Sequence, residues 1–95
     1  MTTLTTAPLD YRRIAEAFVH PLKLRILTLM AQPPPPRAEE DTPEPGYSPH
    51  RLSIALGEPL GNVSYHIHQL ENAGLIKLVA VKQRRGALEH YYNLA

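Results

Sequence analysis

The amino-acid sequence predicts a mainly α-helical domain that ends in a small β-hairpin, an α+β fold class. Apolar residues recur at helical spacing in four segments before residue 75, which predicts four amphipathic helices. Residues 75–94 instead form two runs rich in aliphatic and aromatic residues around a glycine-containing turn, a pattern typical of a hairpin. The expected order is helix, helix, proline-rich loop, helix, helix, strand, strand.

The first predicted helix begins at Pro8, because proline is tolerated in the first turn of a helix. Its apolar stripe consists of Tyr11, Ile14, Ala15 and Phe18. Residues 1–7 are rich in threonine, and we expect them to be a flexible N-terminus. The stripe needs a surface to pack against, either the core of the domain or a partner.

The second predicted helix begins at Pro21 and is apolar on more than one side. Its core stripe consists of Leu22, Ile26, Leu29 and Met30. Leu24 and Leu27 point elsewhere, so this helix is expected to be central in the fold. Lys23 and Arg25 are expected to fill its remaining surface.

Residues 32–47 are predicted to be a loop inserted into a single domain that spans residues 8–95. Six of the ten prolines of the chain lie in this segment, and the run from Pro33 to Pro36 favours an extended polyproline conformation. The segment is also acidic. Its charged residues are Arg37, Glu39, Glu40, Asp41 and Glu44.

The third predicted helix has Ser48 as its N-cap and Pro49 as its first residue. The residues expected to face inward are Leu52, Ala55 and Leu56. Gly57 is expected to end the helix in the left-handed conformation, and Pro59 prevents it from continuing. A short helix, a glycine-containing turn and a longer helix are typical of a helix-turn-helix, although an ordinary pair of packed helices has the same spacing.

The fourth predicted helix, residues 61–73, carries Val63, Ile67 and Leu70 on one apolar stripe. Its other face is neutral and rich in hydrogen-bonding groups. This face consists of Gly61, Asn62, Tyr65, His68, Gln69 and Asn72, and Ser64 lies on its flank. No carboxylate lies among them, and Glu71 falls nearer the apolar flank. Such a face suits base edges and phosphate oxygens, so the helix is expected to enter the major groove of double-stranded DNA.

The predicted hairpin follows this helix directly. Its strands are residues 75–82 and 88–94, and its turn is residues 83–87. The turn holds Arg84 and Arg85, which would reach the sugar-phosphate backbone or the minor groove if the hairpin is the wing of a winged helix-turn-helix. A solvated basic turn is the alternative. The predicted DNA contacts are Arg51, Gly61, Asn62, Ser64, Tyr65, His68, Gln69, Arg84 and Arg85.

Three segments of the chain together resemble a known family. They are HPLKLRILTLM, SPHRLSIALGEPLGNVSYHIHQLENAGLIKLV and RRGALEHYYNL. They are similar to the winged-helix domain of ArsR-type bacterial transcriptional repressors, over about residue 20 to the C-terminus apart from the insertion. The resemblance implies a homodimeric DNA-binding repressor. It also implies that the stripe of the first helix, Tyr11, Ile14, Ala15 and Phe18, forms the dimer interface.

The chain departs from the family pattern at two places. The connection at residues 32–47 is longer than usual, and the second strand is expected to end at Leu94 and Ala95, which leaves no room for the final helix that many ArsR-like repressors use in dimerisation and sensing. The resemblance therefore names neither an effector nor an operator.

Composition and length exclude several other functions. The 95 residues contain no cysteine, so neither a disulfide nor a thiolate metal site is expected. The chain is too short for a separate catalytic domain, and we predict no enzyme and no cofactor. No stretch has the length and apolarity of a membrane span or a signal peptide, so a cytoplasmic protein is expected.

Histidine is the remaining candidate for metal binding. The five histidines are His20, His50, His66, His68 and His90. His66 and His68 lie about 200° apart around a helix, so they cannot hold one metal together, and no metal site is predicted. We expect His66 to hydrogen-bond a backbone group in the core and His68 to face DNA. Ser64, Tyr65 and His66 diverge for the same reason and predict no catalytic site.

The sequence therefore predicts a sequence-specific transcriptional regulator, a repressor that binds an inverted repeat as a homodimer. Two alternatives stay open: a winged helix that binds another protein, and a repressor that senses a metal or small ligand. We expect residues 32–47 to be a passive loop. A proline ligand for a partner and an acidic arm that competes with DNA are the alternatives for this segment.

Overall fold

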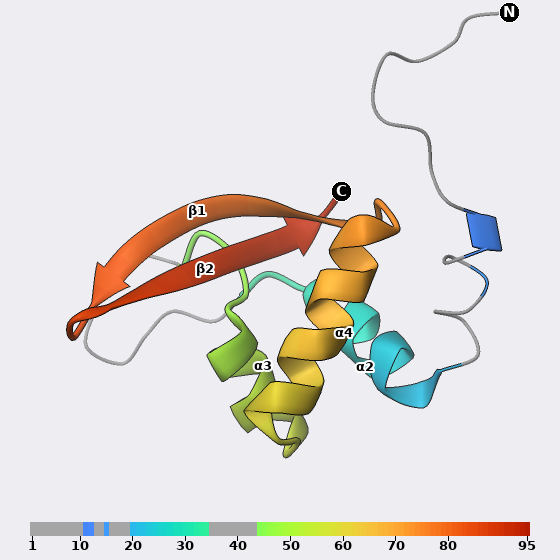
Figure 1. Cartoon of the computed structure of the whole chain (residues 1–95), viewed down its shortest axis with the longest axis horizontal. Helices are drawn as coiled ribbons and strands as arrows, with labels where there is room; N and C mark the ends of the chain where they lie inside the picture. The colour runs from blue at the N-terminus through green and yellow to red at the C-terminus, as the bar shows by residue number, and fades with distance from the viewer. Residues whose placement is uncertain (1–10, 13–14, 16–19, 35–43) are drawn as a thin grey trace, which may run out of the picture.

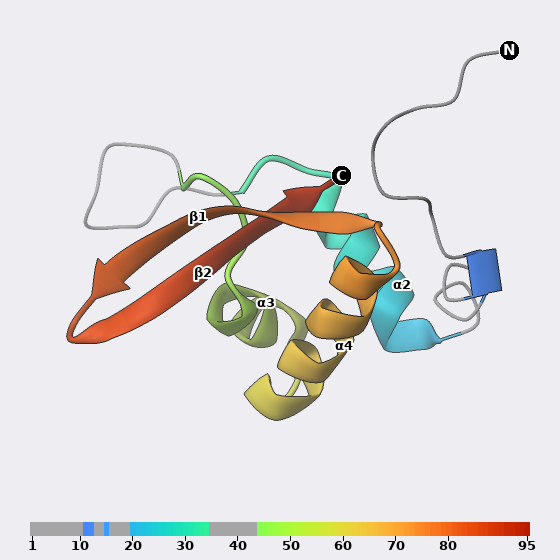
Figure 2. The ribbon, with the colours of Figure 1, turned by 45° about the horizontal axis from the view of Figure 1, so that its top comes forward.

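The computed structural model describes residues 11–12, 15, 20–34 and 44–95 of the chain. Within this part the chain forms three helices followed by an antiparallel two-stranded hairpin (Figure 1). The elements are α2 (Pro21–Met30), α3 (Pro49–Leu56), α4 (Leu60–Asn72), β1 (Ile76–Arg84) and β2 (Ala87–Leu94). The turn end of the hairpin projects beyond the helices in both views (Figures 1 and 2). From the second predicted helix onward, the expected order is confirmed.

The first predicted helix lies mostly outside the described residues. Ile14 and Phe18 of its apolar stripe are outside them. Tyr11 and Ala15 are described and exposed, with 77% of the Tyr11 surface accessible. The four-helix order and the role of this stripe as a dimer interface therefore remain predictions.

Helix α2 buries a different set of residues from the one expected. Ile26 and Met30 are buried as predicted, whereas Leu22 and Leu29 are half-buried against the core. Lys23, predicted to lie on the surface, is buried, with 7% of its surface accessible. Residues 23, 26 and 30 share one helical face, and the aliphatic part of a lysine side chain can fill an apolar position there.

Helix α3 begins as the sequence predicts. The Ser48 hydroxyl oxygen accepts a hydrogen bond from the Arg51 backbone N–H at 3.1 Å, which satisfies one of the donors that a helix start leaves unpaired. Leu52 is fully buried and Leu56 is half-buried, but Ala55 is exposed, so its expected inward position is wrong. The buried direction of this short helix lies between Leu52 and Leu56, which leaves Ala55 on the rim.

The turn between α3 and α4 is held by backbone geometry and by α2. Gly57 has φ = 66°, and the Glu58 N–H donates to the Ser53 carbonyl at 3.0 Å, a glycine C-cap as predicted. The Arg25 guanidinium donates to the Leu56 carbonyl at 2.9 Å and pairs with the Glu58 carboxylate at 3.3 Å. Arg25 is exposed, as expected, but it also fixes the turn to α2.

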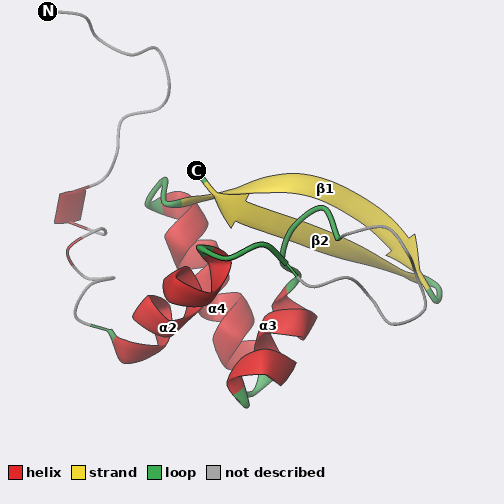
Figure 3. Cartoon of the chain, turned by 180° about the vertical axis from the view of Figure 1, so that it is seen from behind, coloured by secondary structure: helices red, strands yellow, loops and turns green. Residues whose placement is uncertain are grey.

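The hydrophobic core lies where α2, α3 and α4 meet the base of the hairpin (Figure 3). Its buried residues are Ile26, Met30, Tyr47, Leu52, Val63, Ile67, Leu70, Ile76 and Tyr92. The predicted stripe of α4, formed by Val63, Ile67 and Leu70, is at most 1% exposed. Burial of such side chains contributes about 1.5–3 kcal/mol each, so this stripe fixes which face of α4 remains outside.

The hairpin has a tighter turn than the sequence predicts. Strand β1 extends to Arg84 and β2 begins at Ala87, so only Arg85 and Gly86 connect them. Both connecting residues have positive φ, 49° and 81°, which is the geometry of a type I′ hairpin turn. Such a turn matches the right-handed twist of the strands, and it places Arg85 alone at the outermost position.

The end of the predicted loop, residues 44–47, packs against the hairpin, and we call it the insertion foot. Tyr47 exchanges two backbone hydrogen bonds with Tyr92, each 2.8 Å long. The Tyr47 hydroxyl donates to the Gln32 and Pro33 carbonyls at 2.9 and 3.2 Å. Tyr47 is thus a core residue that also ties the two ends of the insertion together, and its expected place in an exposed loop is wrong.

Gly46 brings the insertion foot unusually close to the hairpin. A Cβ atom at this residue would lie 2.8 Å from the Tyr92 carbonyl oxygen, closer than real side chains come to backbone. The Asn93 side-chain amide donates to the Pro45 carbonyl at 3.1 Å on the same stretch. The foot therefore belongs to the folded domain, and only residues before it can be passive.

Replacing residues 35–43 with a short Gly/Ser linker is expected to leave the melting temperature nearly unchanged. The free energy of closing a loop varies slowly with its length, and Tyr47 holds the chain on both sides. Gly46→Ala is the matched control in the foot, and its overpacking should cost about 1–3 kcal/mol. Thermal denaturation followed by circular dichroism measures both, and a larger loss in the linker variant than in Gly46→Ala would contradict this prediction.

Candidate DNA-binding surface

Helix α4 presents the predicted polar face to solvent. Gly61, Asn62, Tyr65 and His68 are exposed, and Ser64 and Gln69 are half-buried. The Gln69 side-chain amide donates to the Tyr65 hydroxyl oxygen at 2.7 Å, which fixes the two side chains relative to each other. The side-chain carbonyl oxygen of Gln69 and the hydroxyl hydrogen of Tyr65 remain able to form a hydrogen bond with a bound molecule.

One carboxylate lies closer to this face than the sequence predicts. The Glu71 Oε1 is 4.0 Å from the His68 Nδ1, one turn along the helix. The pair is charged only when His68 is protonated, and both side chains are accessible to solvent. An exposed pair of this kind contributes little to stability, so its effect lies in the charge next to His68.

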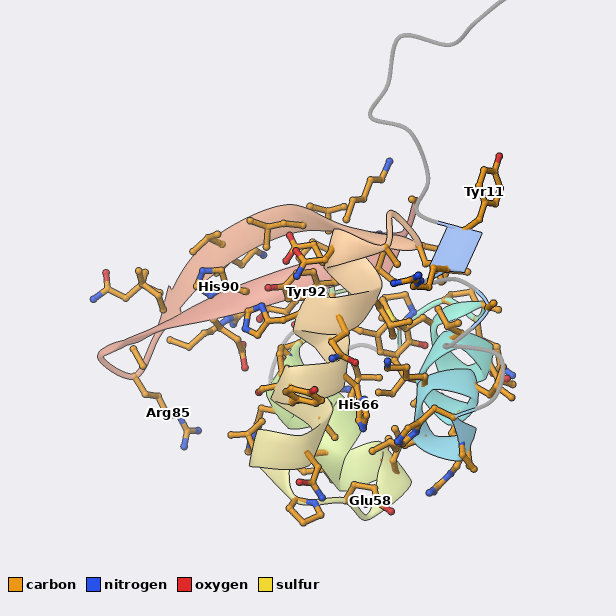
Figure 4. All side chains as sticks on the ribbon, turned by 45° about the vertical axis from the view of Figure 1, so that its right-hand side comes forward. Tyr11, Glu58, His66, Arg85, His90 and Tyr92 are labelled. Carbon is orange, nitrogen blue, oxygen red and sulfur yellow. The ribbon has the colours of Figure 1, made fainter. Side chains whose placement is uncertain are left out.

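The two wing arginines, predicted to act alike, lie in different surroundings. Arg85 is exposed at the hairpin turn, and Figure 4 shows its side chain leaving the tip on the side where α3 and α4 lie. The Arg84 side chain is only 22% exposed. Its NH2 atom is 3.5 Å from Glu44 Oε1, and its Nε is 3.9 Å from Glu89 Oε1.

Arg84 is therefore tied to the insertion foot. The Glu44 side chain is 2% exposed, so protein groups instead of water must stabilise the negative charge of its carboxylate. The sequence does not mark this pair, because Glu44 lies 40 positions away in the chain. Arg85 is left as the wing arginine that points to solvent.

A groove lies between α4, the start of α3 and the hairpin, and we call it the helix–hairpin groove. Its volume is about 480 Å³. The lining residues are Ser48, Pro49, His50, Leu60, Ser64, His68, Arg84, Ala87, Leu88, Glu89, His90 and Tyr92. Three predicted contacts, Ser64, His68 and Arg84, thus line one groove. Arg85 follows Arg84 directly in the chain.

His50 and His90 line this groove although the sequence did not mark them as site residues. His50 lies two positions before the buried Leu52, which is the opposite side of a helix, so the helical phase could have identified it. Arg51 takes another direction. It lines a separate cavity of about 220 Å³ with Leu29, Tyr47, Ile54 and Ala55, and the structure does not bring it into the groove.

His66 lies on the buried side of α4 beside α2. Its ring centroid is 4.2 Å from that of His20, and its Nδ1 is buried without a hydrogen-bond partner, so the expected bond to a backbone group is wrong. Burial lowers the pKa of His66, and the positive forms of His20 and Lys23 lower it further. The neutral imidazole therefore fits this place.

The described residues contain no group of three histidine, aspartate or glutamate side chains placed to hold a metal ion. They also contain no helix of the length and apolarity needed to cross a membrane.

Acidification is expected to destabilise the fold through His66. Because its pKa is lowered in the folded state, its contribution to stability is complete above about pH 6.5 and falls as the pH drops toward the folded pKa. The melting temperature should therefore fall between about pH 7.5 and about pH 5.5. His66→Gln should reduce this fall, and an equal fall in the variant would assign it to other groups.

Arg84→Ala and Arg85→Ala are expected to differ in stability. Removing the Arg84 guanidinium takes a cation from the buried Glu44 carboxylate and should cost about 1–3 kcal/mol. Arg85→Ala should stay within about 0.5 kcal/mol of the wild type, because Arg85 is exposed. Urea denaturation measures both changes. Adding Glu44→Ala to Arg84→Ala should recover part of the loss, and strict additivity would count against the pair.

Comparison with known proteins supports the fold. No protein-family model matches the chain, and no curated protein is similar to it in sequence. A crystal structure of a possible transcriptional regulatory protein (fragment 1–100) from Mycobacterium bovis matches with a TM-score of 0.59 and 22% identity, over 88% of this chain and 72% of that one. Another match is a solution structure from the same organism, described as a homodimeric winged helix-turn-helix DNA-binding domain (fragment 1–100) of a possible ArsR-family transcriptional regulator.

The second match has a TM-score of 0.58 and 18% identity, over 88% of this chain and 62% of that one. The chain thus spans less than two thirds of the length of that structure. Likeness at this level of identity establishes the fold. The chain has the winged helix-turn-helix fold, in which α3 and α4 are the helix-turn-helix and β1 and β2 form the wing.

Proposed function

We propose that this protein is a transcriptional regulator of the ArsR type that binds double-stranded DNA in a sequence-specific manner. Helix α4 enters the major groove, and the wing contacts the neighbouring backbone or minor groove. One observation carries the proposal: Ser64 and His68 of the neutral, exposed face of α4 line one groove with the hairpin, and the solvent-facing Arg85 lies at the tip of that hairpin. The sequence motifs that resemble ArsR-type repressors support the family assignment.

The face of α4 has the chemistry that base recognition requires. Asn62, Tyr65 and Gln69 supply donors and acceptors, and side-chain amides can pair with adenine in the major groove. Ser64 and His68 lie toward the wing, where they can meet phosphate oxygens. Arg85 adds a positive charge at the tip of the hairpin. Phosphate contacts provide affinity, and base contacts provide specificity.

The regulator acts as a homodimer on an inverted repeat. Two α4 helices related by a two-fold axis would meet half-sites about one helical turn apart, roughly 34 Å. The homodimeric state of the similar domain from Mycobacterium bovis supports this assembly. The exposed Tyr11 and the apolar stripe predicted around it offer the surface for the second copy. A repressor needs only to occupy DNA, which these surfaces suffice to do.

Selection of binding sites from random duplexes tests the proposal. The purified protein is expected to enrich an inverted repeat and to sediment as a dimer at micromolar concentration. Ser64→Ala, Tyr65→Ala and His68→Ala combined should remove the sequence preference while some non-specific binding remains. Failure to enrich any sequence, with no binding to duplex DNA at low salt, would refute DNA binding and favour a protein-interaction domain.

Arg85→Ala is expected to weaken specific and non-specific binding together. If Arg85 neutralises one phosphate, the slope of log K against log salt concentration should become shallower by about 0.9. Lys77→Ala is the matched control, because it removes an exposed charge near the base of the hairpin instead of its tip. Fluorescence anisotropy over a salt series measures both slopes. Equal effects of the two variants would show that net charge, and not the wing, sets the affinity.

A further inference from the structure

The helix–hairpin groove contains three histidines from three different elements. His50 comes from the first turn of α3, His68 from the exposed face of α4, and His90 from β2. All three are exposed to solvent. The helices and the hairpin thus bring together side chains that lie up to 40 positions apart in the sequence.

The other charged side chains that line the groove are one cation and one anion. They are Arg84 and Glu89, whose Nε and Oε1 atoms lie 3.9 Å apart, and Arg84 also pairs with Glu44 of the insertion foot. Protonation of the histidines therefore changes the charge of the groove most directly. Histidine is the side chain whose change of charge lies closest to neutral pH.

The position of the groove indicates what it would hold. This step rests on the proposed function, with α4 in the major groove and the wing at the adjacent minor groove. The two grooves of a DNA duplex are separated by one sugar-phosphate strand, so that strand must pass between α4 and the wing. The helix–hairpin groove is the space between these two elements.

We propose that His50, His68 and His90 form a proton-linked seat for the DNA backbone, so that affinity for DNA rises as the pH falls. A phosphate next to an imidazole favours the protonated form of the imidazole. DNA binding therefore takes up protons at any pH at which the histidines of the free protein are neutral. By linkage, affinity falls as the pH rises. The dependence disappears at low pH, where the histidines of the free protein already carry their protons.

Each element around the groove contributes other groups that face these histidines. Glu71 lies beside His68 on α4 and pairs with it when His68 is protonated. The hairpin contributes Arg84, Glu89 and the buried Tyr92, and burial raises the pKa of the Tyr92 hydroxyl. Helix α3 contributes the neutral Ser48. Tyr92 thus stays neutral over the range tested.

The test measures binding of a fluorescein-labelled duplex of about 20 base pairs and mixed sequence, at constant ionic strength, between about pH 6 and about pH 8. Each proton taken up changes the binding constant about tenfold per pH unit. We expect the wild type to bind at least about tenfold more tightly at the acidic end. His50→Gln, His68→Gln and His90→Gln combined should bind with little dependence on pH.

Two control variants distinguish a failure of the histidine proposal from a failure of the proposed DNA binding. Arg85→Ala should weaken binding at every pH but keep the wild-type dependence on pH, because Arg85 does not titrate in this range. His20→Gln removes a histidine outside the groove and should also keep that dependence. The melting temperature of each variant is measured at each pH, since acid acts on the fold through His66 in the opposite direction.

The outcomes are distinct. DNA binding whose pH dependence is absent in the wild type, or survives in the triple variant, overturns the histidine seat and leaves the proposed function standing. Loss of the dependence in His20→Gln would place the titrating group near His66 and also overturn the seat. Absence of binding to any duplex at any pH overturns both the seat and the proposed function.

Discussion

The burial of Tyr47 and Tyr92 in one core holds together the parts of the molecule that the proposed function needs. An isolated two-stranded hairpin is marginally stable in water, so the wing depends on its attachment to the helices. Tyr92 supplies that attachment with a buried side chain, and its backbone pairs with that of Tyr47. Burial raises the pKa of both hydroxyls above the ordinary tyrosine value. The wing therefore stands at a fixed place relative to α4.

Sequence periodicity was sufficient to locate α2, α3 and α4 and to identify the exposed face of α4. Val63, Ile67 and Leu70 identify the inner face of α4, and the outer face follows by elimination. The two ends of α3 were also predictable, because the caps Ser48 and Gly57 depend only on residues close to them in the chain. Lys23 and Ala55 show where the pattern fails. Residue type alone does not reveal that an aliphatic stem fills a core position, or how wide the buried face of a two-turn helix is.

The candidate site was less predictable, because its groups come from distant parts of the chain. Two neighbouring arginines look equivalent in the sequence, yet Arg84 pairs with Glu44 in an acidic, proline-rich segment where no periodicity marks a contact. The burial of Tyr47, in the same segment, was not predictable either, because it depends on the hairpin residue Tyr92, 45 positions later. His50 and His90 meet across the groove for a similar reason. Such juxtapositions arise only in the tertiary fold.

At Arg85, in the type I′ turn, the residue that would stabilise the hairpin most differs from the residue that the proposed DNA contact requires. Arg85 occupies the left-handed region with φ = 49°, where a residue with a Cβ atom is disfavoured by about 1 kcal/mol relative to glycine. Asparagine or glycine would suit this turn better and would shorten the reach of the wing. A search for more stable variants of the domain would therefore select against Arg85. Under the proposed function, the most stable hairpin and a wing that contacts DNA therefore require different residues at position 85, and this chain carries arginine there.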